Sequence, residues 1–180
     1  MRGILFTTLA DMVEEQHGLA FWHKVLDAAD TTDGGAYTSG GNYPTQEFMG
    51  IVGLLGGMLG IPSEFLLRAY GEFLLTRLAE SFPDFFEPPS LKKFLLGIDT
   101  AIHVEVEKIY KDSNLPNFTY EDIAPDKLVM HYRSSRRLCH LAEGLIAGAA
   151  AHYGVECSIL HNRCLLRGDE CCTLELQIYD

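Results

Sequence analysis

Three side chains that donate hydrogen bonds stand two residues apart in the segment "HYRSSRR". If this segment is extended, Tyr132, Ser134 and Arg136 point to one face, because alternate side chains of a strand share a face. A guanidinium forms paired, charge-assisted hydrogen bonds, so the row suits a dicarboxylate or a phosphate. The competing interpretation is a strand end with a solvated arginine, in which Ser134 or Ser135 caps a helix that starts near Arg137.

The cysteines at the end of the chain form a second pattern with possible chemistry. If "RGD" is a three-residue hairpin loop, Leu166 pairs with Glu170. Counting outward then places Cys164 directly opposite Cys172, with about 4.5–5.5 Å between the two Cβ atoms. Both thiols would lie on the same face of the sheet.

Further ligand types stand close enough in sequence to complete a metal site. His161 lies three residues before Cys164, and Cys139 begins the preceding predicted helix. The sequence therefore predicts a tetrahedral Cys3His zinc site with the ligands Cys139, His161, Cys164 and Cys172. The alternatives are reduced thiols on a strand face or a cross-strand disulfide. Neighbouring strand residues face opposite ways, so Cys171 is left out, and Cys157 is assigned to core packing.

Composition and charge limit the classes of function. The chain has 180 residues, of which 47% are hydrophobic, as in a globular protein. That length favours one domain over residues 1–180, with a sizeable core. The formal net charge of −11 argues against a nucleic-acid-binding surface, which would be basic, and against adsorption to anionic lipid.

The sequence shows no export or membrane-spanning segment, so we expect a cytoplasmic location. "MRGILFTTLADMVEEQHG" contains acidic residues and no small-residue cleavage site. The apolar run "FMGIVGLLGGMLGI" is too short to span a bilayer and is rich in glycine. In the cytoplasm the cysteines would serve as thiols, metal ligands or redox groups rather than as structural disulfides.

The elements that position these groups begin with a mainly helical part over residues 1–112. Apolar spacing and helix-starting residues predict helices over 2–16 and 19–28, from Pro44, from Pro62, and after Ser90 through "LKKFLLGIDTAIHVEVEKIY". Glycines recur at near-helical spacing between Gly50 and Gly60, and each costs roughly 0.5–1 kcal/mol in a helix relative to alanine. We interpret this stripe as close helix–helix contact, the alternative being contact with a flat, bulky ligand.

Residues 113–180 carry the strand patterns. "NFTYEDIA" and "KLVMHYRS" flank the turn "PDK", and "VECSILHNRCLL" and "CCTLELQIYD" form a second pair. Between them "RLCHLAEGLIAGAAAHYG" is a small-residue helix that Gly154 closes. The predicted fold is α+β, with a helical N-terminal lobe packed on a C-terminal antiparallel sheet of about four strands that carries an inserted helix.

Over essentially its whole length the chain resembles a bacterial stand-alone haem-nitric oxide/oxygen binding (H-NOX) domain, related to the haem domain of soluble guanylate cyclase. The motifs are the "MRG" start, "FPDFF", the histidine in "FLLGIDTAIHVEV", Pro116, and "YRSSR" before "LAEGLIAG". The resemblance implies a haem b between the two parts, with His103 as the axial iron ligand and Tyr132, Ser134 and Arg136 on the propionates. Because the chain has no C-x-x-C-H, the haem would be held non-covalently. Taken alone, a histidine at the edge of an apolar helix face is more often a partly buried polar residue.

The resemblance also implies which residues form the haem pocket: Leu5, Leu9, Leu74, Leu78, Pro116 and Leu141. Leu141 and Leu74 correspond to the distal tyrosine and its polar partner in members that hold oxygen. Bound oxygen is polarised and gains from a hydrogen-bond donor, whereas nitric oxide binds ferrous haem without one. An apolar distal side therefore predicts nitric oxide, and also carbon monoxide, as the ligand.

The expected function is a non-enzymatic nitric oxide sensor. Nitric oxide would break the iron bond to His103, and the freed helix would signal to a separate partner, in bacterial relatives a histidine kinase or a cyclic-di-GMP enzyme. One alternative is a thiol or zinc redox sensor with haem as a second input. Another is a haem peroxidase-like enzyme, which needs a distal histidine or arginine. The last alternative is a haem-free module that binds a small molecule or a protein.

Overall fold

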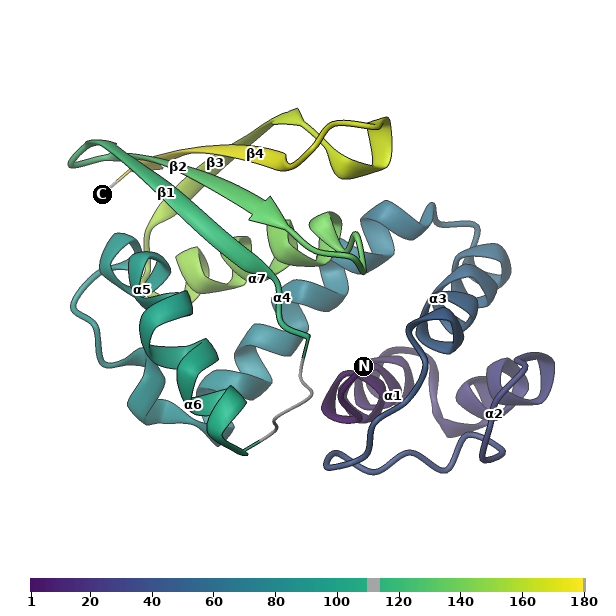
Figure 1. The fold of residues 1–180 in the computed structure, drawn as a ribbon. Coiled ribbons are helices and arrows are strands. Elements are labelled where there is room, and N and C mark those ends of the chain that lie inside the picture. The colour runs from purple at the N-terminus through teal and green to yellow at the C-terminus, as the bar shows by residue number, and fades with distance from the viewer. Residues whose placement is uncertain (110–113, 180) are drawn as a thin grey trace.

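The computed structural model describes residues 1–109 and 114–179, except the side chains of residues 105, 106 and 109. The expected boundary between residues 112 and 113 thus lies outside the described residues. The first helices are α1 (Ile4–His17), α2 (Leu19–Ala28), α3 (Thr45–Leu59) and α4 (Ser63–Ser81). The first three form a lobe to one side, and α1 and α3 pack on α4 (Figure 1). Predicted and observed helices agree closely here.

The segment that carries His103 is less regular than the sequence predicts. After the short 3-10 turn η1 (Pro83–Phe86), it consists of α5 (Leu91–Gly97), the π-helical turn η2 (Ile98–Ile102) and α6 (His103–Ile109). The Ser90 hydroxyl accepts a hydrogen bond from the Lys93 N–H at 3.4 Å, which confirms the predicted cap. The prediction of one continuous helix after Ser90 is wrong, because the π-turn interrupts the helix directly before His103.

The strands confirm the predicted α+β fold. They are β1 (Asn117–Ala124), β2 (Lys127–Arg133), β3 (Glu156–Arg163) and β4 (Cys172–Tyr179), in the antiparallel order β1-β2-β4-β3. Helix α7 (Cys139–His152) is inserted between the two hairpins and runs under the sheet beside α4 (Figure 1). On β2 the side chains of Leu128, Met130 and Tyr132 are buried and those between them are more exposed, as alternation requires.

Helices α4 and α7 approach so closely that glycine is needed at the contact. A Cβ atom added at Gly144 would lie 2.1 Å from the carbonyl oxygen of Arg68. One added at Gly71 would lie 2.6 Å from the carbonyl oxygen of Leu141. The small residues of α7 thus bring its backbone against α4, and this pair forms the rigid centre of the molecule.

The glycine stripe of α3 serves no such contact. A Cβ atom added at Gly50, Gly53, Gly57 or Gly60 would meet nothing within 4 Å among the described residues. Only at Gly56 would it approach another group, the carbonyl oxygen of Ile61 at 2.7 Å. The interpretation of the stripe as helix–helix packing is therefore wrong, since the close contact at Gly56 is with the turn between α3 and α4.

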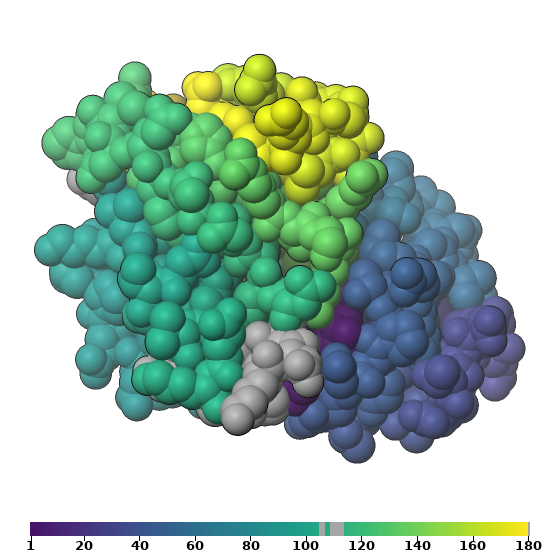
Figure 2. Space-filling view, in the orientation of Figure 1, coloured from purple at the N-terminus to yellow at the C-terminus, as the bar shows by residue number. Residues whose placement is uncertain are grey.

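Two large apolar clusters meet on α4. Leu74 belongs to the cluster of the N-terminal lobe, and its neighbour Leu75 belongs to the cluster between α5, α7 and the sheet. In the space-filling view the purple and blue N-terminal lobe lies beside the green and yellow C-terminal part (Figure 2). Within the described residues no single helix is long and apolar enough to cross a membrane; α3 and α4 pass that test only as a pair, bent by 110°.

Candidate functional site

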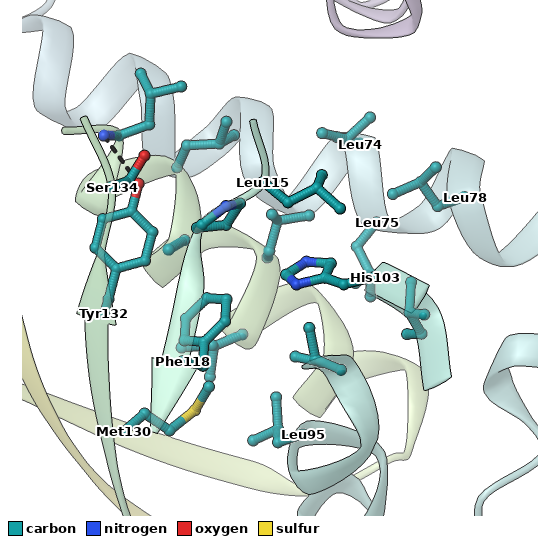
Figure 3. Close-up of a pocket in the computed structure, with 18 of the residues that line it drawn as sticks. Leu74, Leu75, Leu78, Leu95, His103, Leu115, Phe118, Met130, Tyr132 and Ser134 are labelled. Atoms are coloured by element: carbon teal, nitrogen blue, oxygen red, sulfur yellow. Dashed lines mark hydrogen bonds between the residues drawn. The ribbon is translucent and has the colours of Figure 1, made fainter. Parts of the chain in front are cut away.

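A cavity lies between α4, α7, the α5–α6 segment and the inner face of β1 and β2 (Figure 3). Its polar lining residues are His103, Tyr132, Ser134 and Arg136. Its apolar lining residues are Leu5, Leu74, Leu75, Leu78, Phe85, Phe86, Phe94, Leu95, Ile98, Ile102, Leu115, Pro116, Phe118, Met130, Leu138, Leu141, Ala142, Leu145 and Ile146. The residues predicted to contact the two ends of a haem thus share one largely apolar cavity.

His103 is held at the cavity wall by a carboxylate that sequence reasoning missed. Its Nδ1 lies 2.5 Å from Oδ1 of Asp99, one turn earlier. The other oxygen, Oδ2, accepts the backbone N–H of Phe118 on β1 at 2.6 Å. A carboxylate partner on Nδ1 fixes the ring orientation and leaves Nε2 to bind a metal. His103 therefore has the arrangement of a metal ligand rather than that of a solvated side chain.

Tyr132, Ser134 and Arg136 face the cavity although the strand ends before two of them. The segment turns after Arg133, and the Ser134 hydroxyl accepts the backbone N–H of Arg136 at 3.2 Å. Burial still alternates, because these three side chains are buried or half-buried while Arg133 and Arg137 are exposed. The Tyr132 hydroxyl accepts the N–H of Leu138 at 3.1 Å (dashed in Figure 3).

The competing capping interpretation of this segment is wrong. Helix α7 starts at Cys139 with Leu138 as its N-cap residue, and no side chain caps it. The Ser135 hydroxyl accepts a hydrogen bond from the Asn114 amide at 3.2 Å. Burial lowers the pKa of Arg136, because it disfavours the charged guanidinium. A charge placed at the edge of an apolar cavity in this way favours an anionic partner.

Burial also keeps Tyr132 protonated. It raises the pKa of the Tyr132 phenol to about 12, although hydrogen bonds from Ser134 and Leu138 act in the opposite direction. The phenol is therefore a donor at neutral pH. It can offer that proton to an anionic ligand while its oxygen still accepts from the backbone.

The predicted pocket leucines lie in the cavity wall with one exception. Leu5, Leu74, Leu78 and Leu141 line the cavity together with Pro116. Leu9 does not line it and is instead buried in the core of the N-terminal lobe. Leu9 lies on the same face of α1 as Leu5 but about 6 Å further along the helix axis, where it packs in the core of the N-terminal lobe.

The cysteine cluster forms as predicted, at the outer end of α7. Cys139, Cys164 and Cys172 are buried, and each offers a ligand atom within 4.8 Å of those of the others and of His161. The Sγ atoms of Cys139 and Cys164 are 3.6 Å apart. Zinc–sulfur bonds of about 2.3 Å at tetrahedral angles place sulfurs roughly 3.8 Å apart, and a disulfide about 2.05 Å. The spacing fits ligands of one metal ion.

Backbone donors also point at the sulfurs. The N–H of Leu166 lies 3.4 Å from Sγ of Cys164, and the N–H of Leu165 lies 3.3 Å from Sγ of Cys172. Such donors stabilise thiolates. Burial raises the pKa of the Cys172 thiol to about 11, and a bound cation is what favours the thiolate of such a cysteine.

The hairpin that carries these cysteines differs from the prediction. The pairing of Arg163 with Thr173 places Cys164 next to Cys172 as expected. The prediction of a three-residue loop is wrong, because Leu165–Arg167 forms a 3-10 turn and Leu166 does not pair with Glu170. This turn aims the backbone donors at the sulfurs.

Tyr132 connects the cavity to the cysteine cluster. It pairs with Cys172 across β2 and β4. Its side chain lines the cavity and also packs in one buried cluster with Cys139, Cys164 and Cys172. The two predicted sites are therefore adjacent.

The cavity is apolar, with one oriented histidine on its wall and a tyrosine, a serine and an arginine at another part of the lining. These are the groups that a non-covalent haem site needs. The family profile described as Haem-NO-binding matches residues 2–161. The chain belongs to this family, the H-NOX domains, which bind haem and the gases nitric oxide and carbon monoxide and are coupled to signalling partners. These domains are sensors and are not themselves catalytic.

Solved relatives share the whole fold. An H-NOX protein from S. oneidensis in the Fe(II)NO state superimposes with a TM-score of 0.94, at 32% identity over 100% of both chains. The unliganded Fe(II) H-NOX protein from K. algicida gives 0.92 at 29% identity, over 100% of this chain and 97% of that one. Soluble guanylate cyclase gcy-35 of Caenorhabditis elegans is 25% identical over 83% of this chain, which spans 22% of that enzyme.

Proposed function

We propose that this domain is a nitric oxide sensor that excludes oxygen. His103 would bind the haem iron through Nε2, and Tyr132, Ser134 and Arg136 would bind the propionates. When bound, the haem supplies a ferrous iron with one open position. Binding of nitric oxide by the haem would release His103 and so free the segment that carries it. Leu5 and Pro116 would press on the haem and define its resting shape.

The observation that carries this proposal is the absence of a distal donor within the described cavity lining. By the family resemblance, Leu141 and Leu74 correspond to the distal tyrosine and its polar partner in members that hold oxygen, and Leu78 adds to the same apolar wall. Tyr132 is the one tyrosine in the lining, and it belongs to the arginine end. The same lining offers no histidine besides His103, so it does not provide the acid–base pair of a peroxidase.

Release of His103 would be transmitted through Asp99. This carboxylate joins the His103 ring to the backbone of β1, so a moving histidine pulls on the sheet and on the π-turn together. A π-turn is a rare interruption of an α-helix and occurs often at functional sites. It would let α6 shift without unfolding α5.

The test is the visible spectrum of the reduced protein without ligand, under air and with nitric oxide. We expect a haem Soret band that air leaves unchanged and that nitric oxide shifts to the position of haem without its histidine. A stable oxygen complex would overturn the assignment of the leucine wall. Failure to bind added haem would overturn the whole proposal.

We further propose that Cys139, His161, Cys164 and Cys172 bind one structural zinc ion. The sulfur spacing, the N–H groups on two of the sulfurs, and the buried Nε2 of His161, which has no partner among the described residues, all suit a Cys3His site. One zinc per protein chain is expected after purification, and Cys172→Ser should lose it. Cys157→Ser, outside the cluster, is the matched control.

As the signalling partner we propose a histidine kinase or a cyclic-di-GMP enzyme of the cytoplasm, where thiols stay reduced. The cyclase relative supports such coupling, because the segment similar to this chain is part of a longer signalling enzyme. Phosphotransfer by a co-expressed candidate kinase, measured with the unliganded and nitric oxide-bound domain, tests it. Identical rates in both states would contradict the pairing.

A second candidate function is a thiol or zinc redox sensor with haem as its second input. The packing of Tyr132 against both the cysteines and the cavity favours this possibility. Oxidation of the cysteines should then change partner inhibition even in protein that lacks nitric oxide. The effect should disappear in Cys164→Ser.

A further inference from the structure

A buried carboxylate stands behind the cysteine cluster. Glu143, on α7, is only 5% exposed. One of its oxygens accepts a hydrogen bond from Nε of Arg68 on α4, and the other is paired with Nδ1 of His161 on β3. His140 adds an Nδ1 atom 3.4 Å from the same carboxylate. Three separate elements thus converge on one carboxylate.

We propose that Glu143 is the positioning residue for the zinc ligand His161. This inference rests on the proposed zinc site. Glu143 occupies Nδ1 of the imidazole, so it selects the tautomer whose Nε2 is available to the metal and fixes the ring in that orientation. The structure leaves Nε2 buried without a hydrogen-bond partner among the described residues, an arrangement that is costly unless something binds there.

Arg68 supports the role of Glu143 in orienting His161. The Arg68 guanidinium donates to one oxygen of the buried carboxylate and leaves the other oxygen for Nδ1 of His161. The ion pair thus supplies the charge partner that a buried carboxylate needs. A charged acceptor also raises the basicity of the imidazole toward a metal.

Arg68 also decides between two possible cation sites. His140, Glu143 and His161 alone bring ligand atoms within 4.8 Å of one another. A cation bound there would lie against the guanidinium that already neutralises the carboxylate, so this position is electrostatically unfavourable. The cysteines offer three buried sulfurs, whose hydrogen-bond partners among the described residues include no cationic side chain. The metal therefore belongs on the cysteines, with Glu143 as support.

The experiment compares the zinc affinity of the haem-containing protein with that of Glu143→Gln, by competition with a chromophoric chelator under reducing conditions. Loss of a carboxylate that orients a histidine ligand should weaken zinc binding by about 10–100-fold. Glu64→Gln is the matched control, because Glu64 lies 3.9 Å from Nε2 of His140 and has no contact with His161 among the described pairs. An unchanged Soret band shows that each variant is folded.

A second ligand type separates positioning from a general structural role. His161→Cys gives a four-thiolate site that needs no tautomer, so adding Glu143→Gln to it should cost little further affinity. If Glu143→Gln weakens zinc binding equally in both backgrounds, Glu143 acts on the fold and the proposal is overturned.

Two measurements on the unmodified protein hold even where a variant fails to fold. Zinc X-ray absorption should show three sulfurs at about 2.3 Å and one nitrogen at about 2.0–2.1 Å. Nitrogen NMR of the reduced carbon monoxide form should show His161 protonated at Nδ1 and metal-bound at Nε2. Metal bound through Nδ1 would overturn the role of Glu143 while leaving the zinc site intact. No zinc retained, or zinc without sulfur ligands, would instead overturn the zinc site itself.

Discussion

Arg136 is the one arginine of "RSSRR" that turns toward the cavity, whereas Arg133 and Arg137 are exposed. Two or more charge-assisted hydrogen bonds to a propionate are worth about 1.5–3 kcal/mol each. We therefore expect Arg136→Ala to release haem at least about 10-fold faster, as measured by transfer to an apo-globin acceptor. Arg133→Ala is the matched control and should match the wild type; equal rates in all three proteins would contradict the propionate assignment.

Leu141 tests the basis of gas selection. Leu141→Tyr places a hydroxyl in an otherwise apolar wall, where it can donate to a polarised ligand. We expect this variant, and not Leu141→Phe, to give a detectable oxygen complex when the reduced protein is exposed to air. If neither variant binds oxygen, a single donor at this wall is insufficient and the role of Leu141 is smaller than proposed.

At the residue scale the sequence predicted the polar cavity residues well, because short motifs and a recognisable family place them. It did not predict Asp99 as the partner of His103. The i, i+4 spacing of this pair was a usable signal, but its second contact, the N–H of Phe118, joins residues 19 apart across a change from helix to strand. Such contacts follow from the fold and not from local spacing.

Among the elements, the α4–α7 contact is the least tolerant of change. Gly144→Ala would force its Cβ against the Arg68 backbone, which cannot move without separating the helices, so we expect a loss of about 1–3 kcal/mol or more in unfolding free energy. Gly53→Ala fills open space on a helix and should instead stabilise by about 0.5–1 kcal/mol. Urea unfolding of Gly144→Ala and Gly53→Ala measures both changes in unfolding free energy. A harmless Gly144→Ala would show that the helices are less tightly packed than the structure indicates.

Asp99, the hydrogen-bond partner of His103, lies in the π-turn η2. Asp99→Asn removes the charge that makes the imidazole a strong donor to a metal. We expect a lower iron–histidine stretching frequency in the resonance Raman spectrum of the reduced protein. Glu121→Gln alters a comparable contact, with His131 at 2.7 Å, outside the cavity lining, and serves as the control. Equal frequencies in the two variants would remove Asp99 from the proposed relay.

Strand and helix boundaries were predicted closely where the pattern is local, as for β1, whose limits agree with the sequence segment. The π-turn and the 3-10 turn after Cys164 were not predicted. Neither turn has a signal in apolar spacing, because each is a short departure from the regular pattern around it. The open face of α3 was misinterpreted for a related reason, since a small-residue stripe does not show whether another element packs on it.

For the molecule as a whole, the lobe of α1–α3 is tied together by a buried carboxylate. Glu47 on α3 accepts hydrogen bonds from the Thr32 hydroxyl at 2.7 Å and the Tyr37 hydroxyl at 2.6 Å, which fastens the glycine-rich loop. Burial opposes its charge, yet these hydrogen bonds hold the pKa of Glu47 below 4.5. We expect Glu47→Gln to cost about 1–3 kcal/mol at pH 7.

The sign of the pH dependence follows from the direction of this shift. A carboxyl with a depressed folded-state pKa stabilises the protein above the unfolded value of 4.5, and that stabilisation is lost as the pH falls through the folded value. The difference between the wild type and Glu47→Gln should therefore shrink as the pH falls below 4.5. Urea unfolding at several pH values measures it, and a constant difference would show that the charge of Glu47 is unimportant.

The π-turn before His103 has a consequence for comparing relatives. A π-turn closes its hydrogen bonds over one residue more than an α-helix does. Deleting one residue within Ile98–Ile102 would restore a regular helix in which the flanking segments keep the faces they present. A relative with an ordinary helix here should therefore align with a one-residue gap just ahead of its histidine. Its carboxylate should then stand three residues before the histidine, not four.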